Sequence, residues 1–133
     1  MTHLPHLHPR LAVRIFAEEN KAFGPGVMRL LHNVMRLSSL RAAAQEMGMA
    51  YSKAWRIMKE CEDALGFPLL RSTTGGRHGG GAALTEEAKL LLSRYEAYTA
   101  ALTDASESLF RSHFADLEEA LSALQKENEE NPL

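Results

Sequence analysis

Five polar side chains within residues 51–65 are the strongest candidates for chemistry in this sequence. At helical spacing they lie away from the apolar residues of the same segment, and they are Tyr51, Ser52, Lys53, Arg56 and Lys59. Hydroxyl donors and cations are the groups that bind base edges and phosphates. We predict that Arg56 makes a bidentate contact with guanine and that Tyr51 and Ser52 reach a base edge or a thymine methyl group. For Lys53 and Lys59 we predict phosphate contacts.

A glycine-rich stretch, residues 73–81, is the second candidate site. It holds five glycines at positions 75–81, and the polar residues among and before them are Thr73, Thr74, Arg77 and His78. Glycine lets a backbone approach phosphate closely, and a cation at such a tip fits the minor groove. The flanking apolar segments, 69–72 and 82–84, predict the two strands of a β-hairpin. A nucleotide-binding loop is excluded, because neither G-x-x-x-x-G-K-S/T nor a G-x-G-x-x-G between a strand and a helix is present.

These side chains need a scaffold, and the apolar spacing predicts three helices. The first covers about 27–37, the second follows Ser39 as its N-cap and stops at Gly48, and the third covers 51–65. A helix-turn-helix needs small residues where its helices cross, and a glycine in its turn. The small residues are Ala43 or Ala44 in the second helix and Ala54 in the third, and the glycine of the turn is Gly48. A plain helical hairpin is the alternative interpretation. We add Ser39 to the predicted DNA-binding residues.

A long helix is predicted after the N-cap Thr85, over residues 86–128. A heptad-like apolar seam runs along its first part, and its members are Leu91, Tyr95, Tyr98, Leu102 and Leu109. We predict that this seam joins two copies of the chain, with packing onto the first helix of the same chain as the alternative. From residue 110 the apolar register moves by one position, which predicts a kink at 111–113. Residues 129–133 are expected to fray.

The N-terminal residues complete the predicted organisation. Residues 1–9 are interpreted as a flexible arm. Residues 10–18 alternate in polarity as a strand does, and that strand needs a partner, either the hairpin or a second subunit. The predicted fold class is therefore mainly α with a small β wing. A winged helix-turn-helix domain over 10–85 is followed by a long C-terminal dimerisation helix.

Charge is unevenly distributed along the chain. The formal net charge is −2, but residues 10–94 hold 13 Lys and Arg against 8 Asp and Glu, whereas residues 95–133 hold 2 against 9. The basic front part suits an anionic partner. One cysteine, no signal peptide and no apolar run of membrane-spanning length predict a cytoplasmic protein with no membrane partner. No metal and no cofactor are expected, because the three histidines of the arm lack a Cys or carboxylate to complete a site.

Four stretches between Arg10 and Tyr98 carry a family resemblance. They are Gly24-Pro25-Gly26, Ser39 with the alanines of 42–44, the Met-Ala-Tyr-Ser-Lys-Ala-Trp run of 49–55, and the Thr-Gly-Gly-Arg-His-Gly-Gly-Gly-Ala-Ala-Leu-Thr run of 74–85. Together they resemble the N-terminal DNA-binding domain of the ModE family of molybdate-responsive regulators, a winged helix similar to that of LysR-type regulators. The resemblance implies a homodimer joined through its DNA-binding domains, and regulation of metal-transport or metalloenzyme genes.

The ModE family pattern also includes C-terminal oxyanion-binding domains with a Ser-Ala-Arg-Asn motif. These 133 residues contain no such motif, so we do not expect direct molybdate binding by this chain. The leading interpretation is a dimeric regulator that binds a pseudo-palindromic operator, and the alternative is a winged-helix protein-interaction module without DNA binding. An enzyme is not expected, because His32, His78 and His113 have no carboxylate or nucleophile at a suggestive spacing, and Cys61 lies on an apolar helix face.

Overall fold

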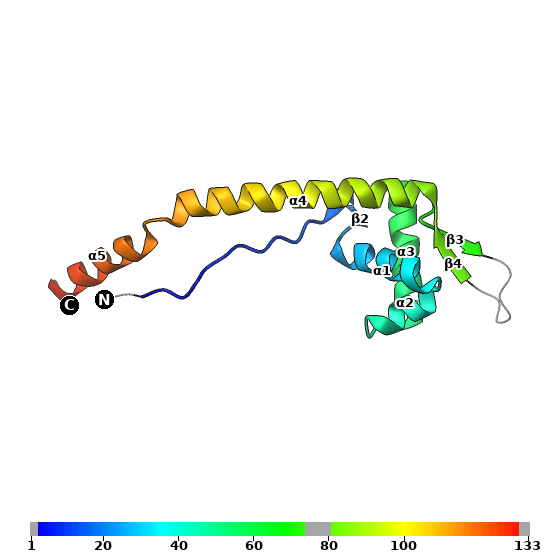
Figure 1. Cartoon of the computed structure of the whole chain (residues 1–133), viewed down its shortest axis with the longest axis horizontal. Coiled ribbons are helices and arrows are strands. Elements are labelled where there is room, and N and C mark those ends of the chain that lie inside the picture. Colours follow the sequence, from blue (N-terminus) through cyan, green and yellow to red (C-terminus); the bar gives the residue numbers. More distant parts are fainter. Residues whose placement is uncertain (1–2, 74–80, 131–133) are drawn as a thin grey trace. The chain divides into compact units, whose positions relative to one another are not determined.

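The computed structural model of the protein describes residues 3–73 and 81–130 (Figure 1). Its helices are α1 (Pro25–Leu37), α2 (Leu40–Glu46), α3 (Tyr51–Leu65), α4 (Glu86–Phe114) and α5 (Leu117–Glu130). Its strands form two antiparallel pairs, β1 (Ile15–Ala17) with β2 (Asn20–Phe23) and β3 (Leu70–Thr73) with β4 (Gly81–Leu84). The predicted class, mainly α with a small β wing and a long C-terminal helix, is confirmed.

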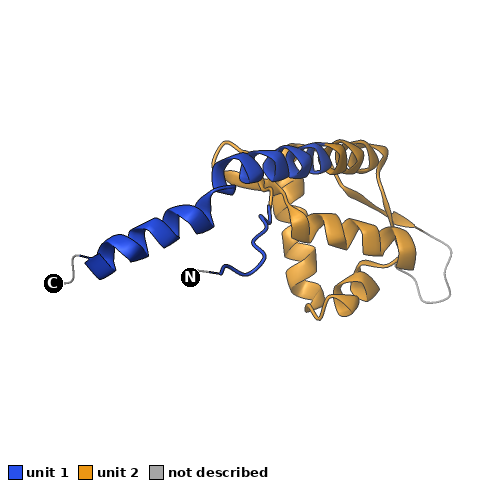
Figure 2. Ribbon diagram, turned by 60° about the vertical axis from the view of Figure 1, so that its left-hand side comes forward, with its two compact units in different colours: residues 1–11, 98–133 blue, residues 12–97 orange. Residues whose placement is uncertain are grey.

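The chain divides into two compact units. One is residues 12–97, and the other joins residues 1–11 to residues 98–133, so that α4 contributes to both (Figure 2). No helix in the described ranges is long and apolar enough to cross a membrane.

Helices α1, α2 and α3 form the centre of the unit 12–97. The backbone of Ser38 turns left-handed at φ 57° and ends α1, and Ser39 then caps α2 because its hydroxyl accepts a hydrogen bond from the backbone N–H of Ala42 at 3.0 Å. The turn to α3 passes through Gly48 at φ 65°, a conformation that costs other residues about 1–2 kcal/mol. Ala43 and Ala54 have no exposed surface. The three predicted helices are confirmed to within two residues at each end.

The partner predicted for the N-terminal strand was wrong. That strand is short, β1, and it pairs with the next segment of the same chain, β2, rather than with the wing. A left-handed residue, Glu18 at φ 57°, lets the chain reverse between the two strands. The segment Asn20–Phe23 shows no alternation of polarity, which is why sequence periodicity missed it. It nevertheless carries Phe23 into the core with no exposed surface.

The second strand pair is the predicted wing hairpin. Its register pairs Leu70 with Leu84 and Thr73 with Gly81, and each observed strand lies within one residue of its predicted limits. Leu69 and Leu84 are buried in the core of the unit. The wing therefore grows directly out of the core that holds the three helices.

Helix α4 starts at a capped threonine and covers the core with its first turns. The Thr85 hydroxyl accepts a hydrogen bond from the N–H of Ala88 at 3.0 Å and donates one to the carbonyl of Pro68 at 2.8 Å. Farther along, Tyr95 is 3% exposed, its hydroxyl donates to the carbonyl of Val13 at 2.7 Å, and its ring meets that of Phe23 edge-on at 4.7 Å.

Tyr95 therefore corrects one part of the predicted dimer seam. It was assigned to a contact between two chains, and it is buried within one chain instead. Leu91 is half-buried against the same core. Heptad spacing is equally satisfied by packing onto the chain's own core and onto a second chain, which is why spacing alone assigned both residues to the seam.

The second unit contains the end of α4, helix α5 and the N-terminal residues. The helical hydrogen bonding of α4 continues through residues 111–113, where the kink was predicted, and the break falls at residues 115–116, just before α5. The rings of Phe110 and Phe114 stack at 4.5 Å on the last turn of α4. The N–H of Leu4 donates to the carboxylate of Glu118 at 2.8 Å, so the arm has a specific contact within this unit.

Replacing Tyr95 with phenylalanine tests the contact that joins α4 to the N-terminal segment. The Tyr95→Phe variant loses the hydrogen bond to Val13 and keeps the ring, and we expect its free energy of unfolding to fall by about 1 kcal/mol. Urea unfolding followed by circular dichroism measures the difference. The matched variant Tyr98→Phe changes a residue that is 53% exposed and should leave stability unaltered. Equal stability of the wild type and Tyr95→Phe would contradict this role.

Candidate nucleic-acid interface

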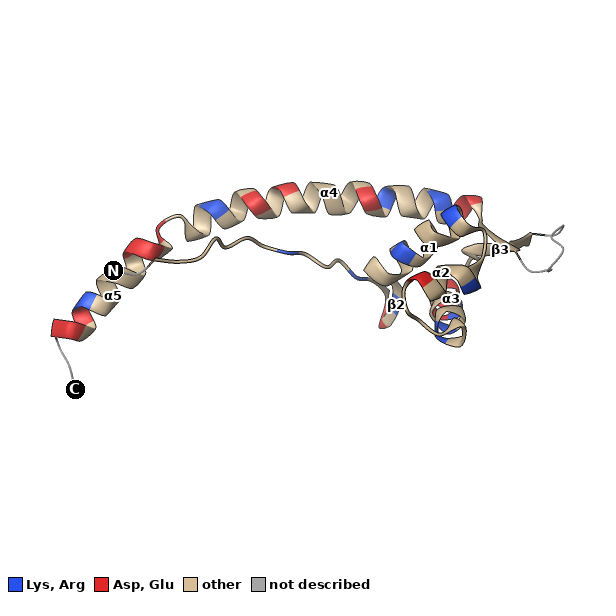
Figure 3. Cartoon of the chain, turned by 60° about the horizontal axis from the view of Figure 1, so that its bottom comes forward, with Lys and Arg blue, Asp and Glu red and all other residues tan. Residues whose placement is uncertain are grey.

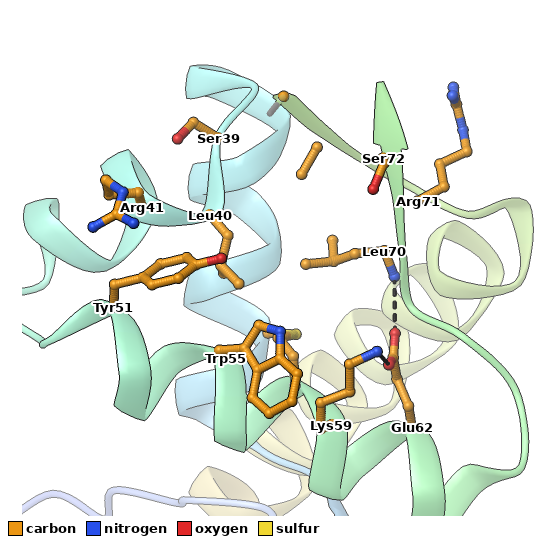
Figure 4. Close-up of a pocket in the computed structure, with 13 residues that line it drawn as sticks. Ser39, Leu40, Arg41, Tyr51, Trp55, Lys59, Glu62, Leu70, Arg71 and Ser72 are labelled. Atoms are coloured by element: carbon orange, nitrogen blue, oxygen red, sulfur yellow. Dashed lines mark hydrogen bonds and ion pairs between the residues drawn. The ribbon is translucent and has the colours of Figure 1, made fainter. Parts of the chain in front are cut away.

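A groove lies between α3 and the wing, with a cavity volume of about 360 Å³ (Figure 4). Three parts of the chain line it: the start of α2, one side of α3 and the base of the hairpin. The lining residues are Ser39, Leu40, Arg41, Tyr51, Trp55, Met58, Lys59, Glu62, Leu70, Arg71, Ser72, Gly81 and Ala82. The groove therefore joins the two segments that the sequence singled out.

The residues predicted on α3 divide between two adjacent faces. Tyr51 and Lys59 line the groove, whereas Ser52, Lys53 and Arg56 are exposed and lie outside it. Successive residues of a helix are turned by about 100°, so one helix presents both a wing-facing side and an outward side. The single polar face predicted from the sequence is thus two surfaces.

Partners within the chain distinguish the cations of this region. Arg56 is paired with Glu60 at 3.9 Å, an exposed contact worth about 0.3–0.5 kcal/mol, which leaves Arg56 available to a stronger ligand. Lys59 is held more firmly, because it is 3.3 Å from the carboxylate of Glu62 and lies 5.6 Å from the ring centre of Trp55.

The structure adds Arg41, Trp55 and Arg71 to the residues that the sequence predicted. Arg41 lies over the ring of Tyr51 at 4.2 Å, Trp55 is 49% exposed in the groove, and Arg71 is exposed on β3. Arg71 follows from the alternation of the strand, whereas no sequence signal places Arg41 beside Tyr51. Their approach depends on the crossing of α2 and α3.

The remaining predicted contacts lie at the ends of elements. The Ser39 hydroxyl lines the groove but is already engaged as the cap of α2. Thr73 is the last residue of β3. Thr74, Arg77 and His78 lie outside the described residues, so their DNA contacts stay predictions.

Within the described residues there is no metal-ligand cluster and no exposed cysteine. No group of three or more His, Cys, Asp or Glu residues within it is placed to hold a metal ion. Burial raises the pKa of the Cys61 thiol above its ordinary value, with a smaller opposing effect of Lys21. Cys61 is 3% exposed, so its thiol is neutral and packs as a core residue.

Residues 26–89 match the family model described as bacterial regulatory helix-turn-helix protein, lysR family. This segment is therefore similar to a LysR-type helix-turn-helix domain. It runs from the start of α1 to the first turn of α4 and includes every lining residue of the groove.

Relatives of known name extend the similarity beyond the LysR-type domain. The molybdenum-pterin-binding protein MopB of Rhodobacter capsulatus is 34% identical over 95 residues, which are 71% of this chain and 35% of MopB. The transcriptional regulator ModE of Haemophilus influenzae is 36% identical over 72 residues, 54% of this chain and 28% of that protein. The DNA-binding transcriptional dual regulator ModE of Escherichia coli is 29% identical over 87 residues, 65% of this chain and 31% of its own length. These relatives confirm the ModE resemblance, and the chain spans about a third of their length.

Among solved structures, a LysR family transcriptional regulator aligns with a TM-score of 0.48 at 20% sequence identity. The alignment covers 69% of this chain and 28% of that protein.

The wing is attached to the third helix by a carboxylate. Glu62 of α3 accepts hydrogen bonds from the backbone N–H groups of Leu69 at 2.7 Å and Leu70 at 3.2 Å. On the other side, the N–H of Ala82 donates to the carbonyl of Ser38 at 3.0 Å. Both strands of the hairpin are therefore tied to the helices at their base.

There is little room for a side chain at the first position of β4. A Cβ atom on Gly81 would lie 2.1 Å from the Thr73 hydroxyl oxygen and 3.3 Å from the carbonyl oxygen of Ser38. A side chain at residue 81 would therefore displace the Thr73 hydroxyl on the paired strand and would crowd the carbonyl of Ser38.

Removing the Glu62 carboxylate tests this attachment. In Glu62→Ala the N–H groups of Leu69 and Leu70 lose a charged acceptor, and we expect the free energy of unfolding to fall by about 2 kcal/mol. Amide hydrogen exchange at residues 69 and 70 should also become faster. The control Glu60→Ala removes an exposed carboxylate two residues earlier on the same helix. If both variants behaved alike in unfolding and exchange, the attachment through Glu62 would be disproved.

Proposed function

We propose that this chain is a DNA-binding transcriptional regulator of the ModE type, and that it acts as a dimer on a pseudo-palindromic operator. Helix α3 enters the major groove, and the wing of residues 69–84 lies on the backbone or in the minor groove. The observation that carries the proposal is the attachment of the wing to α3, which keeps two DNA-facing elements in a fixed relation. The proposal includes no catalytic step.

The outward side of α3 carries side chains that could hydrogen-bond directly to base edges. Ser52, Lys53 and Arg56 are exposed there, and Arg56 has only a weak, solvent-exposed ion pair to break. In a helix-turn-helix the residues near the start of the recognition helix contact base edges. These three lie within the first two turns of α3.

Charge supports the same orientation. Helix α5 carries Glu118, Glu119, Glu127, Glu129 and Glu130 against a single Lys126 (Figure 3). An acidic segment is repelled by phosphate, whereas the segment from Arg10 to Arg94 has an excess of cations. DNA therefore engages the LysR-type domain rather than the C-terminal helix.

An apolar groove near the end of α4 supports dimerisation. It has a volume of about 380 Å³, and the residues that line it are Leu11, Leu102, Ala105, Ser106, Leu109, Phe110, His113 and Phe114. Tyr98 and Leu109 of the predicted seam are 53% and 59% exposed. Large apolar side chains gathered on one open face mark an interaction surface. A symmetric dimer reads half-sites that are about 34–36 Å apart, or a multiple of that distance.

The names of the relatives connect this proposal with molybdenum. MopB is named for binding a molybdenum pterin, and other relatives are named as regulators. We propose that the genes under control concern molybdenum or a molybdoenzyme. Direct binding of molybdate by this chain is not part of the proposal.

Replacing Arg56 tests DNA recognition. Fluorescence anisotropy with the duplex upstream of the chain's own gene should show tight binding that weakens steeply with salt. Arg56→Ala should weaken binding to this duplex by about 1–3 kcal/mol, with a smaller effect on random duplex. Arg94→Ala removes an exposed cation from α4 and should bind as the wild type does. No binding to either duplex at low salt would favour a protein-interaction module.

Placing a charge in the apolar groove tests dimerisation. We expect Leu109→Asp to sediment as a monomer and to lose affinity for a two-half-site duplex, because an aspartate in a buried apolar contact lacks a partner. Ala100→Asp introduces the same charge at an exposed position of α4 outside the groove and should remain dimeric. A dimeric Leu109→Asp protein would place the interface elsewhere.

A further inference from the structure

Two aromatic rings of α3 each hold a cation in the groove beside the wing. Tyr51 and Trp55 are four residues apart, so they lie on the same side of the helix. Arg41, from α2, lies over the ring of Tyr51 at 4.2 Å, and Lys59 lies near the ring of Trp55 at 5.6 Å. A cation over an aromatic face is attracted by the ring quadrupole, which fixes its position while its charge persists.

Lys59 and Arg41 differ in whether a carboxylate of the same chain pairs with their charge. Lys59 is paired with Glu62 at 3.3 Å. Arg36, at the end of α1, is likewise paired with Glu46 at 2.6 Å. Within residues 3–73 and 81–130, by contrast, no carboxylate pairs with Arg41 and its guanidinium donates no hydrogen bond. Arg41 is exposed, so it is a positioned cation without a counter-ion at the mouth of the groove.

The one carboxylate in the groove does not oppose an incoming anion. The Glu62 side chain is 12% exposed, and its oxygens accept hydrogen bonds from two backbone N–H groups and face Lys59. Figure 4 shows Glu62 turned toward β3 and Lys59, whereas Arg41 and Tyr51 lie on the opposite side of the groove. The negative charge is thus compensated within the base of the wing.

We propose that this groove holds a backbone phosphodiester of duplex DNA, that Arg41 is the residue that binds it, and that Tyr51 is the positioning residue for Arg41. The inference rests on the proposed function. When α3 occupies the major groove and the wing reaches the neighbouring minor groove, the strand that separates those grooves passes between α3 and the wing. A guanidinium presents several N–H donors in a planar arrangement that matches phosphate oxygens.

The salt dependence of binding separates a phosphate contact from a structural role. Each phosphate contact contributes about 0.9 to the slope of log Kd against log salt concentration. We expect Arg41→Gln to lower the slope by about that amount, Arg41→Lys to preserve the slope, and the control Arg94→Gln to match the wild type. Tyr51→Leu should weaken binding severalfold while keeping the slope, because the charge of Arg41 remains.

The fluorescence of Trp55 supplies an independent measurement, because this is the only tryptophan of the chain. A phosphodiester in the groove should change its emission when the unlabelled wild-type protein is saturated with duplex DNA. Suppose that the wild type binds duplex DNA with a measurable salt slope. Unchanged Trp55 emission, or an unaltered slope for Arg41→Gln, would then overturn this inference and leave the proposed function intact. Absence of salt-dependent binding by the wild type would overturn both.

Discussion

Close contact between small side chains on α2 and α3 is the constraint on which the DNA-facing surface depends. Ala43, Ala44 and Ala54 have no exposed surface, so the backbones of the helices approach without a large side chain between them. The left-handed Gly48 allows the short turn that this approach requires. A larger residue at any of the three alanine positions would overpack the core at a cost of about 1–3 kcal/mol. Any resulting shift of α3 would move the groove with it, because α3 forms one wall.

The wing depends on the same helices for its position. Glu62 fixes the first strand and the carbonyl of Ser38 fixes the second. A two-stranded hairpin is marginal by itself in water. Its order at residues 70–73 and 81–84 therefore comes from attachment to the helices, so that a change in the angle of α3 would be transmitted to the wing.

Much of this architecture could be predicted from the sequence because its limits are marked by local signals. Ser39, Gly48 and Thr85 cap or end helices through their own chemistry, and the glycine-rich stretch between two apolar runs marks the wing. These signals depend on neighbours only a few residues away. The ModE resemblance, read from the same motifs, agrees with the relatives of known name.

What the sequence could not provide were contacts between distant residues. Nothing local pairs Asn20–Phe23 with Ile15–Ala17 as a hairpin, and nothing local indicates that Tyr95 reaches the carbonyl of Val13 rather than a second chain. Arg41 was missed because its partner ring lies across the helix crossing, and the α3 residues predicted on one face occupy two sides of that helix.

The position of Phe23 and Tyr95 has a bearing on how such domains are exchanged between proteins. Both lie outside the matched segment 26–89, yet their rings touch in the centre of the core with 0% and 3% of their surfaces exposed. The segment matched by the family model is therefore smaller than the part that folds. A gene fusion with its breakpoints at residues 26 and 89 would inherit the DNA-facing surface and leave behind two aromatic residues that hold it together. Breakpoints near residues 12 and 97 would transplant the whole cooperative unit.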